Sequence, residues 1–173
     1  MKRFYFLLFC FFSLILISCA SSNPVYTAIT GNGGQVFFLR PLTLNTSHSM
    51  ISQIDLDVTV NAKGGVFTQA PILNYTLTMP IEQVQYADKI QINIANNTTV
   101  VRSENRIQLF KDISGKKYID LRYSAILNKE DFSQVLQSND TCFIEVIGPD
   151  GTIESIESKD FNLRMQNLRL MVL

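Results

Sequence analysis

Apolar and polar residues alternate along most of the chain after Gly34. In ISQIDLDVTV (51–60), one face of an extended chain would carry Ile54, Leu56, Val58 and Val60. Asp55, Asp57 and Thr59 would lie on the other face. A period of two is typical of a β-strand with one buried face. Similar runs are ILNYTLTM (72–79), KIQINIAN (89–96), RIQLF (106–110), KYIDLRYSAIL (117–127) and TCFIEVIG (141–148).

Turn-forming residues separate these runs. They include Gly64-Gly65, Asn96-Asn97, Ser114-Gly115 and Pro149-Asp150-Gly151. Repeated short strands with such turns between them predict an all-β fold. We expect an immunoglobulin-like antiparallel β-sandwich of about seven to nine strands over residues 35–173. The likeness is architectural, because the chain has no tryptophan for the core and residues 35–173 contain a single cysteine.

One short helix is expected between the strands, in LNKEDFSQVLQS (127–138). Asn128 is a candidate N-cap, and Glu130 and Asp131 are first-turn acids that favour the helix dipole. The apolar residues at helical spacing are Phe132, Val135 and Leu136. We predict a helix from Lys129 to about Gln137 that covers one end of the sheets.

The C-terminal stretch FNLRMQNLRLMVL (161–173) fits two structures. A strand is favoured by two alternating sets, Phe161, Leu163 and Met165, then Leu168, Leu170 and Val172. A helix would instead place Phe161, Met165, Leu168 and Val172 on one face. We predict a strand with an irregularity near Gln166 and Asn167 that completes the protein's own sheet. The alternative is that this apolar end meets a partner.

The chain begins with Met1-Lys2-Arg3 and an apolar run from Phe4 to Ile17, which is the layout of a secretory signal. This run is too short to favour a membrane-spanning helix, which needs roughly 20 apolar residues. Leu16-Ile17-Ser18-Cys19 resembles the lipobox of bacterial lipoproteins. The resemblance implies a signal peptide over residues 1–18, cleaved between Ser18 and Cys19. It also implies lipidation of the Cys19 thiol.

The resemblance further implies a membrane attachment. Several acyl chains hold a protein on a bilayer far longer than one chain does. Ala20 follows the cysteine, which resembles the outer-membrane-sorted lipoproteins rather than those retained at the inner membrane. Residues 19–34, rich in Ser, Asn, Thr and Gly, predict a flexible lipidated tether. We therefore expect a lipid-anchored protein of the cell envelope, with the outer membrane as the favoured location.

Cleavage would leave 155 of the 173 residues, with 13 Lys and Arg against 15 Asp and Glu, a net charge of about −2. A chain of that length fits one domain that buries a sizeable core. The near-neutral charge gives no field that would attract nucleic acid, so we expect no nucleic-acid partner. Cys142 would be the one cysteine of the folded part, and we expect it to be an inert core residue.

The residues that commonly perform catalysis are few. His48 is the only histidine and has no nucleophile or acid at a recognisable spacing. Asp55 and Asp57 share a strand face but lack the loop that gathers oxygen ligands around calcium, and a solvated face is the preferred interpretation. Glu145 lies between Phe143 and Ile147 on one strand face; an edge position facing water is favoured over an apolar setting. We predict no enzyme activity, no metal and no cofactor.

Three functions follow from these observations. The first is a non-catalytic binding or scaffolding module that meets another envelope or extracellular protein through its loops or an exposed strand edge. The second is a carrier of a hydrophobic small ligand between the sheets, motivated by a 46% hydrophobic composition. The third is a hydrolase that uses carboxylates. The sequence favours the first.

Overall fold

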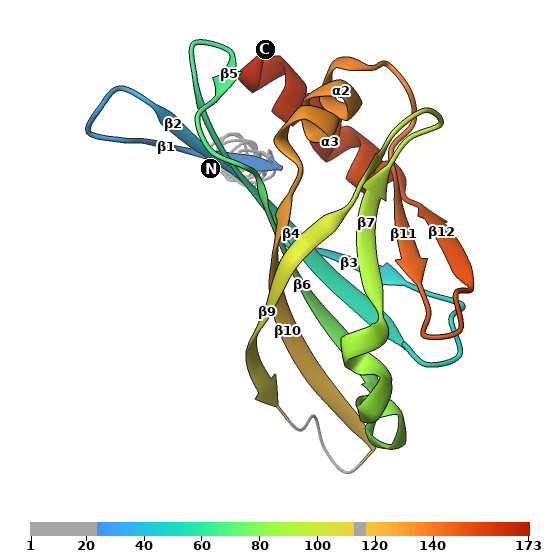
Figure 1. The fold of residues 1–173 in the computed structure, drawn as a ribbon. Coiled ribbons are helices and arrows are strands. Elements are labelled where there is room, and N and C mark those ends of the chain that lie inside the picture. Colours follow the sequence, from blue (N-terminus) through green and yellow to red (C-terminus); the bar gives the residue numbers. More distant parts are fainter. Residues whose placement is uncertain (1–23, 113–116) are drawn as a thin grey trace, which may run out of the picture.

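The computed structural model describes residues 24–112 and 117–173 (Figure 1). The predicted signal peptide, its cleavage position between Ser18 and Cys19, and the lipidated Cys19 lie outside the described residues. Among the described residues, no helix combines the length and the apolar character needed to cross a membrane. The lipid anchor therefore stays a prediction.

Two antiparallel sheets form a β-sandwich, so the predicted all-β class is confirmed. The larger sheet contains β1 (Val25–Ile29), β2 (Gln35–Leu39), β3 (Leu42–Asn45), β4 (Gln53–Lys63), β5 (Val66–Phe67), β6 (Ile72–Pro80), β9 (Ser103–Asp112) and β10 (Tyr118–Leu127). The smaller sheet contains β7 (Gln91–Ala95), β8 (Val100–Val101), β11 (Phe143–Ile147) and β12 (Ile153–Glu157). These twelve strands of the described residues exceed the seven to nine that were expected.

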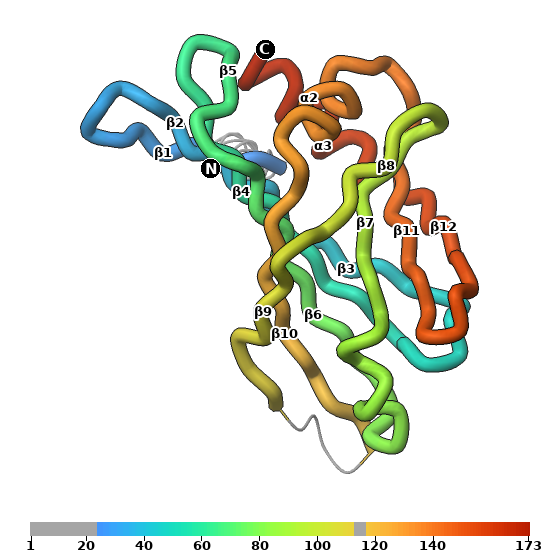
Figure 2. The backbone as a smooth tube through the Cα atoms, in the orientation of Figure 1, coloured from blue at the N-terminus to red at the C-terminus, as the bar shows by residue number. Residues whose placement is uncertain are grey.

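The order of the larger sheet is β1-β2-β4-β6-β10-β9, with β3 and β5 both paired to β4. The order of the smaller sheet is β12-β11-β7-β8. Only Arg102 separates β8 from β9, so the chain passes there from the smaller sheet into the larger one, as Figure 2 shows. The strand order of the larger sheet places β1 and β9 at its opposite edges.

The core follows the period-two pattern in the long strands. Each of the following residues is at most 2% exposed: Ile54, Leu56, Val58 and Val60 of β4, Ile92 and Ile94 of β7, and Ile119, Leu121, Tyr123 and Ala125 of β10. Their burial removes apolar surface from water on the inner faces of both sheets, which is the main driving force of folding. The inward residues predicted for these three runs are confirmed, and β4 and β10 also alternate in burial, whereas β7 is buried at Asn93 and Ala95 as well.

In the part of the chain that the structure describes, three helical segments accompany the sheets, where one short helix was expected. They are the 3₁₀ helix η1 (Ile81–Lys89) and the α-helices α2 (Lys129–Gln137) and α3 (Lys159–Val172). The prediction of α2 is confirmed, because the Asn128 side chain accepts a hydrogen bond from the Asp131 backbone N–H at 3.0 Å and the three predicted apolar residues are buried. η1 begins directly after Pro80, which cannot donate a backbone hydrogen bond to continue β6.

The C-terminal segment is a helix, which corrects the predicted strand. Ser158 caps α3, since its hydroxyl accepts a hydrogen bond from the Phe161 N–H at 3.3 Å. The buried residues are those of the helical pattern, namely Phe161, Met165, Leu168 and Val172. Leu163 is 54% exposed, whereas a strand would have placed it beside Phe161. The segment therefore forms a helix because the helical pattern places its four buried residues on one face that packs on the core.

The predicted tether is also corrected where it is described. Val25–Ile29 pairs with β2 in full register, and residues 30–34 form the turn between the two strands. Within that turn, Gly33 adopts φ 76°, a backbone conformation that glycine adopts most readily. β1 has no alternating burial because most of its residues are exposed. Its strand residues pair with β2, whereas the polar composition of residues 19–34 as a whole predicted a tether.

Glu154 ties the edge strand β12 to the loop after β3. Its carboxylate accepts hydrogen bonds from the Thr46 hydroxyl, and from the backbone N–H and hydroxyl of Ser47, both at 2.7 Å. Burial acts to raise the pKa of Glu154, but these hydrogen bonds outweigh it and hold the pKa below its ordinary value of 4.5. The contact therefore links the two sheets most strongly when the carboxylate is charged.

We expect Glu154→Gln to lower the free energy of unfolding by about 0.5–1 kcal/mol at neutral pH, because the side chain is partly exposed to solvent. The contribution of a group with a lowered folded pKa is present above its unfolded pKa and lost as pH falls through the folded pKa. Urea denaturation at pH 7 and about pH 3 should show the difference from wild type shrinking at the lower pH. Glu157→Gln, an exposed carboxylate on the same strand, is the control, and an equal loss in both variants would contradict the assignment.

Candidate functional site

The main surface feature of the described residues is an open sheet edge at β9 (Figure 1). Among the described strands, β9 pairs with β10 and with no other strand. An edge strand presents backbone N–H and C=O groups that another extended chain can pair with. Natural proteins commonly protect such an edge with charges, proline or short strand length. β9 has ten residues.

Three apolar side chains are exposed along this edge. Ile107 is 60% exposed, and Leu109 and Phe110 are each 50% exposed. The prediction that RIQLF is a half-buried strand is therefore wrong about burial, although the segment is extended. The physical reason is its place in the sheet, because β9 diverges from β8 and extends along the rim of the sandwich.

A register shift places two of these side chains on one face. Ile107 lies opposite Ser124 and Phe110 lies opposite Arg122, while Leu109 is the additional residue between them. Ser124 and Arg122 are two residues apart on β10 and share its outer face. The bulge thus brings Ile107 and Phe110 together on the outer face of the sheet. We call Ile107, Leu109 and Phe110, with the open backbone of β9, the β9 edge.

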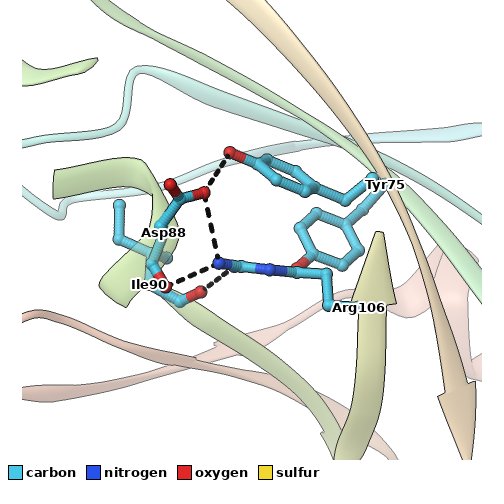
Figure 3. Close-up of polar contacts among 5 residues, drawn as sticks. Tyr75, Asp88, Ile90 and Arg106 are labelled. Carbon is cyan, nitrogen blue, oxygen red and sulfur yellow. Dashed lines mark hydrogen bonds and ion pairs between the residues drawn. The ribbon is translucent and has the colours of Figure 1, made fainter. Parts of the chain in front are cut away.

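Arg106 fixes the β9 edge to the body of the protein (Figure 3). Its guanidinium donates hydrogen bonds to the backbone C=O of Ile90, to the backbone C=O of Asp88 at 2.6 Å and to the Tyr75 hydroxyl at 3.2 Å. The same group lies 4.5 Å from the centroid of the Tyr123 ring, within the range of a cation–π contact. The Arg106 side chain is 18% exposed. One arginine therefore joins β9, the end of η1 and the core.

The two tyrosines beneath Arg106 belong to the core. Their rings stack with centroids 5.4 Å apart, and both side chains are almost fully buried. Burial raises the pKa of Tyr75, and it raises the pKa of Tyr123 to about 12 despite the opposing charge of Arg106. Both phenols are consequently neutral at physiological pH, and they act as packing and hydrogen-bonding groups.

The carboxylates considered as metal ligands lie on the outer face of the larger sheet. Asp57 forms an ion pair with Arg122 at 2.6 Å and accepts a hydrogen bond from the Asn74 amide at 2.8 Å. Asp55 accepts hydrogen bonds from Thr43 at 2.5 Å and from Gln53 at 3.2 Å. In the described part of the chain, no three His, Cys, Asp or Glu side chains gather closely enough to hold a metal ion. The outer face is thus a network of paired side chains.

The remaining candidates from the sequence lie apart from one another. Glu145 is half-buried on β11 and lies opposite Asn93 and Ser155. Its predicted edge position is wrong, because β11 pairs with a strand on each side. His48 lies in the loop after β3, where its Nδ1 accepts a hydrogen bond from the Met50 backbone N–H at 3.3 Å.

Cys142 is buried directly before β11. Burial, and secondarily the charge of Asp140, raise the pKa of its thiol to about 11. The neutral thiol is a poor nucleophile. This agrees with its predicted role as an inert core residue.

A hollow of about 380 Å³ lies between α2, α3 and the loop before β11. Its lining includes Leu136, Cys142, Met165 and Arg169. The Arg169 guanidinium donates hydrogen bonds to the Asn139 side chain and to the Ser138 backbone C=O. Arg169, the one cation of this lining, thus holds the loop before β11.

Sequence reasoning missed Arg106 and the exposure of the β9 edge. An arginine before an alternating run is ordinarily interpreted as a solvated strand end, so the sequence carried no signal for its long-range contacts. A clue to the edge was the charge-poor run from Ile107 to Phe110, which lacks the lysine or proline that commonly protects an exposed strand.

Comparison of the whole chain with protein-family models, with curated proteins and with solved structures finds no significant match.

Proposed function

We propose that this chain is a lipid-anchored cell-envelope protein whose β-sandwich is a non-catalytic binding module. Its partner would be another envelope or extracellular protein that adds an extended segment to β9. The observation that carries this proposal is the β9 edge, a ten-residue edge strand with exposed apolar side chains from Ile107 to Phe110.

Strand addition would use both parts of the β9 edge. In this mode of recognition, the main-chain hydrogen bonds give affinity and alternate side chains give specificity. Ile107 and Phe110 share the outer face, so a partner strand beside β9 would cover them with its own apolar residues. Arg106 holds the strand in place before binding, and a pre-ordered strand loses less conformational entropy when the partner binds.

The envelope location is supported by the first residues of the sequence. The basic start, the apolar run and Leu16-Ile17-Ser18-Cys19 occur in the order that a lipoprotein signal requires. The C-terminal apolar segment, considered as a second contact with a partner, is largely used within the domain because four of its residues pack in the core.

The alternative of a hydrophobic-ligand carrier has less support. A carrier needs a cavity of roughly 300–1,000 Å³ lined mainly by apolar groups. Large side chains that are less than 2% exposed, among them Tyr75, Tyr123, Phe132 and Phe161, occupy the interior. The hollow of about 380 Å³ lies at the helices, not between the sheets.

Photocrosslinking in intact cells tests the proposal. A crosslinker placed on the exposed Gln108 should trap a partner in wild-type protein. Ile107→Lys or Phe110→Lys should lower that yield about tenfold, because charges at an edge oppose strand addition. Ile153→Lys is the matched control, since Ile153 is 63% exposed on the edge strand of the other sheet.

The anchor is measured in the same cells with a palmitate analogue. Wild type should incorporate the label and fractionate with membranes, and Cys19→Ala should do neither. Equal labelling of both proteins would refute the anchor. Equal crosslinking of the Phe110→Lys and Ile153→Lys variants would refute the β9 edge as the binding site.

A further inference from the structure

The proposed anchor would lie close to the folded body. β1 begins at Val25, so residues 20–24 alone separate Cys19 from the sheet. Five residues span at most about 17 Å when fully extended. If Cys19 carries the lipid, the bilayer surface therefore lies within about 17 Å of Pro24. Such a short connection brings one face of the domain to the membrane.

α3 lies beside the point where the chain joins the sheet. The Arg40 backbone N–H donates a hydrogen bond to the Pro24 C=O at 3.0 Å. Arg164, near the middle of α3, donates a hydrogen bond to the C=O of Arg40. α3 also contacts both β1 and β2, and Figure 1 shows it at the end of the molecule where these strands lie. α3 therefore lies close to the point where the described chain enters the sheet.

The outward side of α3 carries exposed leucines among polar residues. Leu170 is 83% exposed, and Leu163 and Leu173 are 54% and 53% exposed. Spacings of seven and three residues place them on one helical face, away from the buried face of Phe161 and Met165. Val66, which is 65% exposed, lies on the hairpin between β4 and β5.

The hairpin reaches the end of the helix. A Cβ atom at Gly65 would lie 3.5 Å from the C=O of Val172. Lys63, on the same hairpin, donates a hydrogen bond to the Asn32 C=O in the turn between β1 and β2. We call the exposed leucines of α3, Leu163, Leu170 and Leu173, the α3 surface.

We infer that the α3 surface lies on the bilayer that carries the anchor. This inference rests on the proposed function, because it needs lipid at Cys19. A helix with exposed leucines beside a lipid anchor would bury them at the boundary between headgroups and acyl chains. Removing these side chains from water is favourable in proportion to the apolar area covered.

This contact would orient the whole domain. β1 and β9 are the two ends of a path of six strands, and neighbouring strands lie about 4.8 Å apart. The β9 edge is then separated from the anchored edge by five strand spacings, about 24 Å. Docking through α3 would direct the β9 edge away from the lipid, where another protein can reach it.

The absence of tryptophan in the chain permits a clean test. Single tryptophans are placed at two exposed positions, Leu170→Trp on the α3 surface and Ile107→Trp on the β9 edge. The processed full-length proteins are reconstituted into phosphatidylethanolamine and phosphatidylglycerol vesicles that contain doxyl-labelled lipid. We expect Leu170→Trp emission to shift to shorter wavelength and to be quenched several-fold more than Ile107→Trp emission.

Flotation of the same vesicles separates the possible outcomes. Protein that floats with the lipid but shows equal quenching at both positions would overturn the inference while leaving the anchor intact. Protein that does not float, with Cys19→Ala as the reference, would overturn the anchor and the inference together. The emission of Leu170→Trp could instead shift with protein concentration and without quenching by the labelled lipid. That result would assign the α3 surface to contact with a second copy of the chain and would also overturn the inference. Because Leu170 is 83% exposed, the substitution leaves the core unchanged.

Discussion

Arg106→Ala should lower the free energy of unfolding by about 3 kcal/mol, because a buried cluster would lose its one cation and several hydrogen bonds. The guanidinium satisfies the backbone C=O groups of Asp88 and Ile90 at the end of η1 and the hydroxyl of Tyr75. Alanine would leave these acceptors without their donor and would uncover the Tyr123 ring. The ion pair with Asp88 adds little, since the Asp88 side chain is 85% exposed.

Urea denaturation measures this loss, and hydrogen exchange of the β9 amides measures its location. Arg106→Lys should recover part of the stability, because an ammonium keeps the charge but cannot reproduce the planar fork of donors. Arg102→Ala is the control, since Arg102 is exposed four residues earlier in the chain. A loss below about 1 kcal/mol for Arg106→Ala would place this residue among ordinary surface charges.

The predictable part of the fold is the part that depends on local periodicity. The runs in β4 and β10 alternate because each strand has one face on the core, and the structure buries the predicted residues of these strands and of β7. α2 was predictable because its cap, its acidic first turn and its apolar face agree with one another. Agreement among several local signals is typical of segments whose structure is independent of distant parts of the chain.

The errors occur where distant contacts decide the structure. Residues 19–34 as a whole are rich in small and polar residues that favour a tether, but Val25–Ile29 within them pairs with β2 as a strand. The run in β9 alternates as β4 does, but alternation cannot show whether a second layer covers the strand. Strand order is likewise absent from local patterns, so the placement of β1 and β9 at opposite edges needed the structure.

The C-terminal segment is the sharpest case of this ambiguity. Phe161, Leu163 and Met165 satisfy a period of two, while Phe161, Met165 and Leu168 satisfy a helical period. A strand would bury Leu163 with Phe161, and a helix would separate them. Tertiary packing resolves the choice, because the helical face fits over the core near β1 and β2.

Phe161→Ala should consequently destabilise the protein by about 4 kcal/mol, since the side chain is fully buried and its removal leaves a cavity in the core. Leu163→Ala should cost less than about 0.5 kcal/mol in solution, because Leu163 is exposed on α3. Chemical denaturation of both variants beside wild type provides the comparison. If the segment were a strand, the two substitutions would remove neighbours from the same buried face and cost similar amounts. Similar losses would therefore contradict the helix and, with it, the apolar surface assigned to the bilayer.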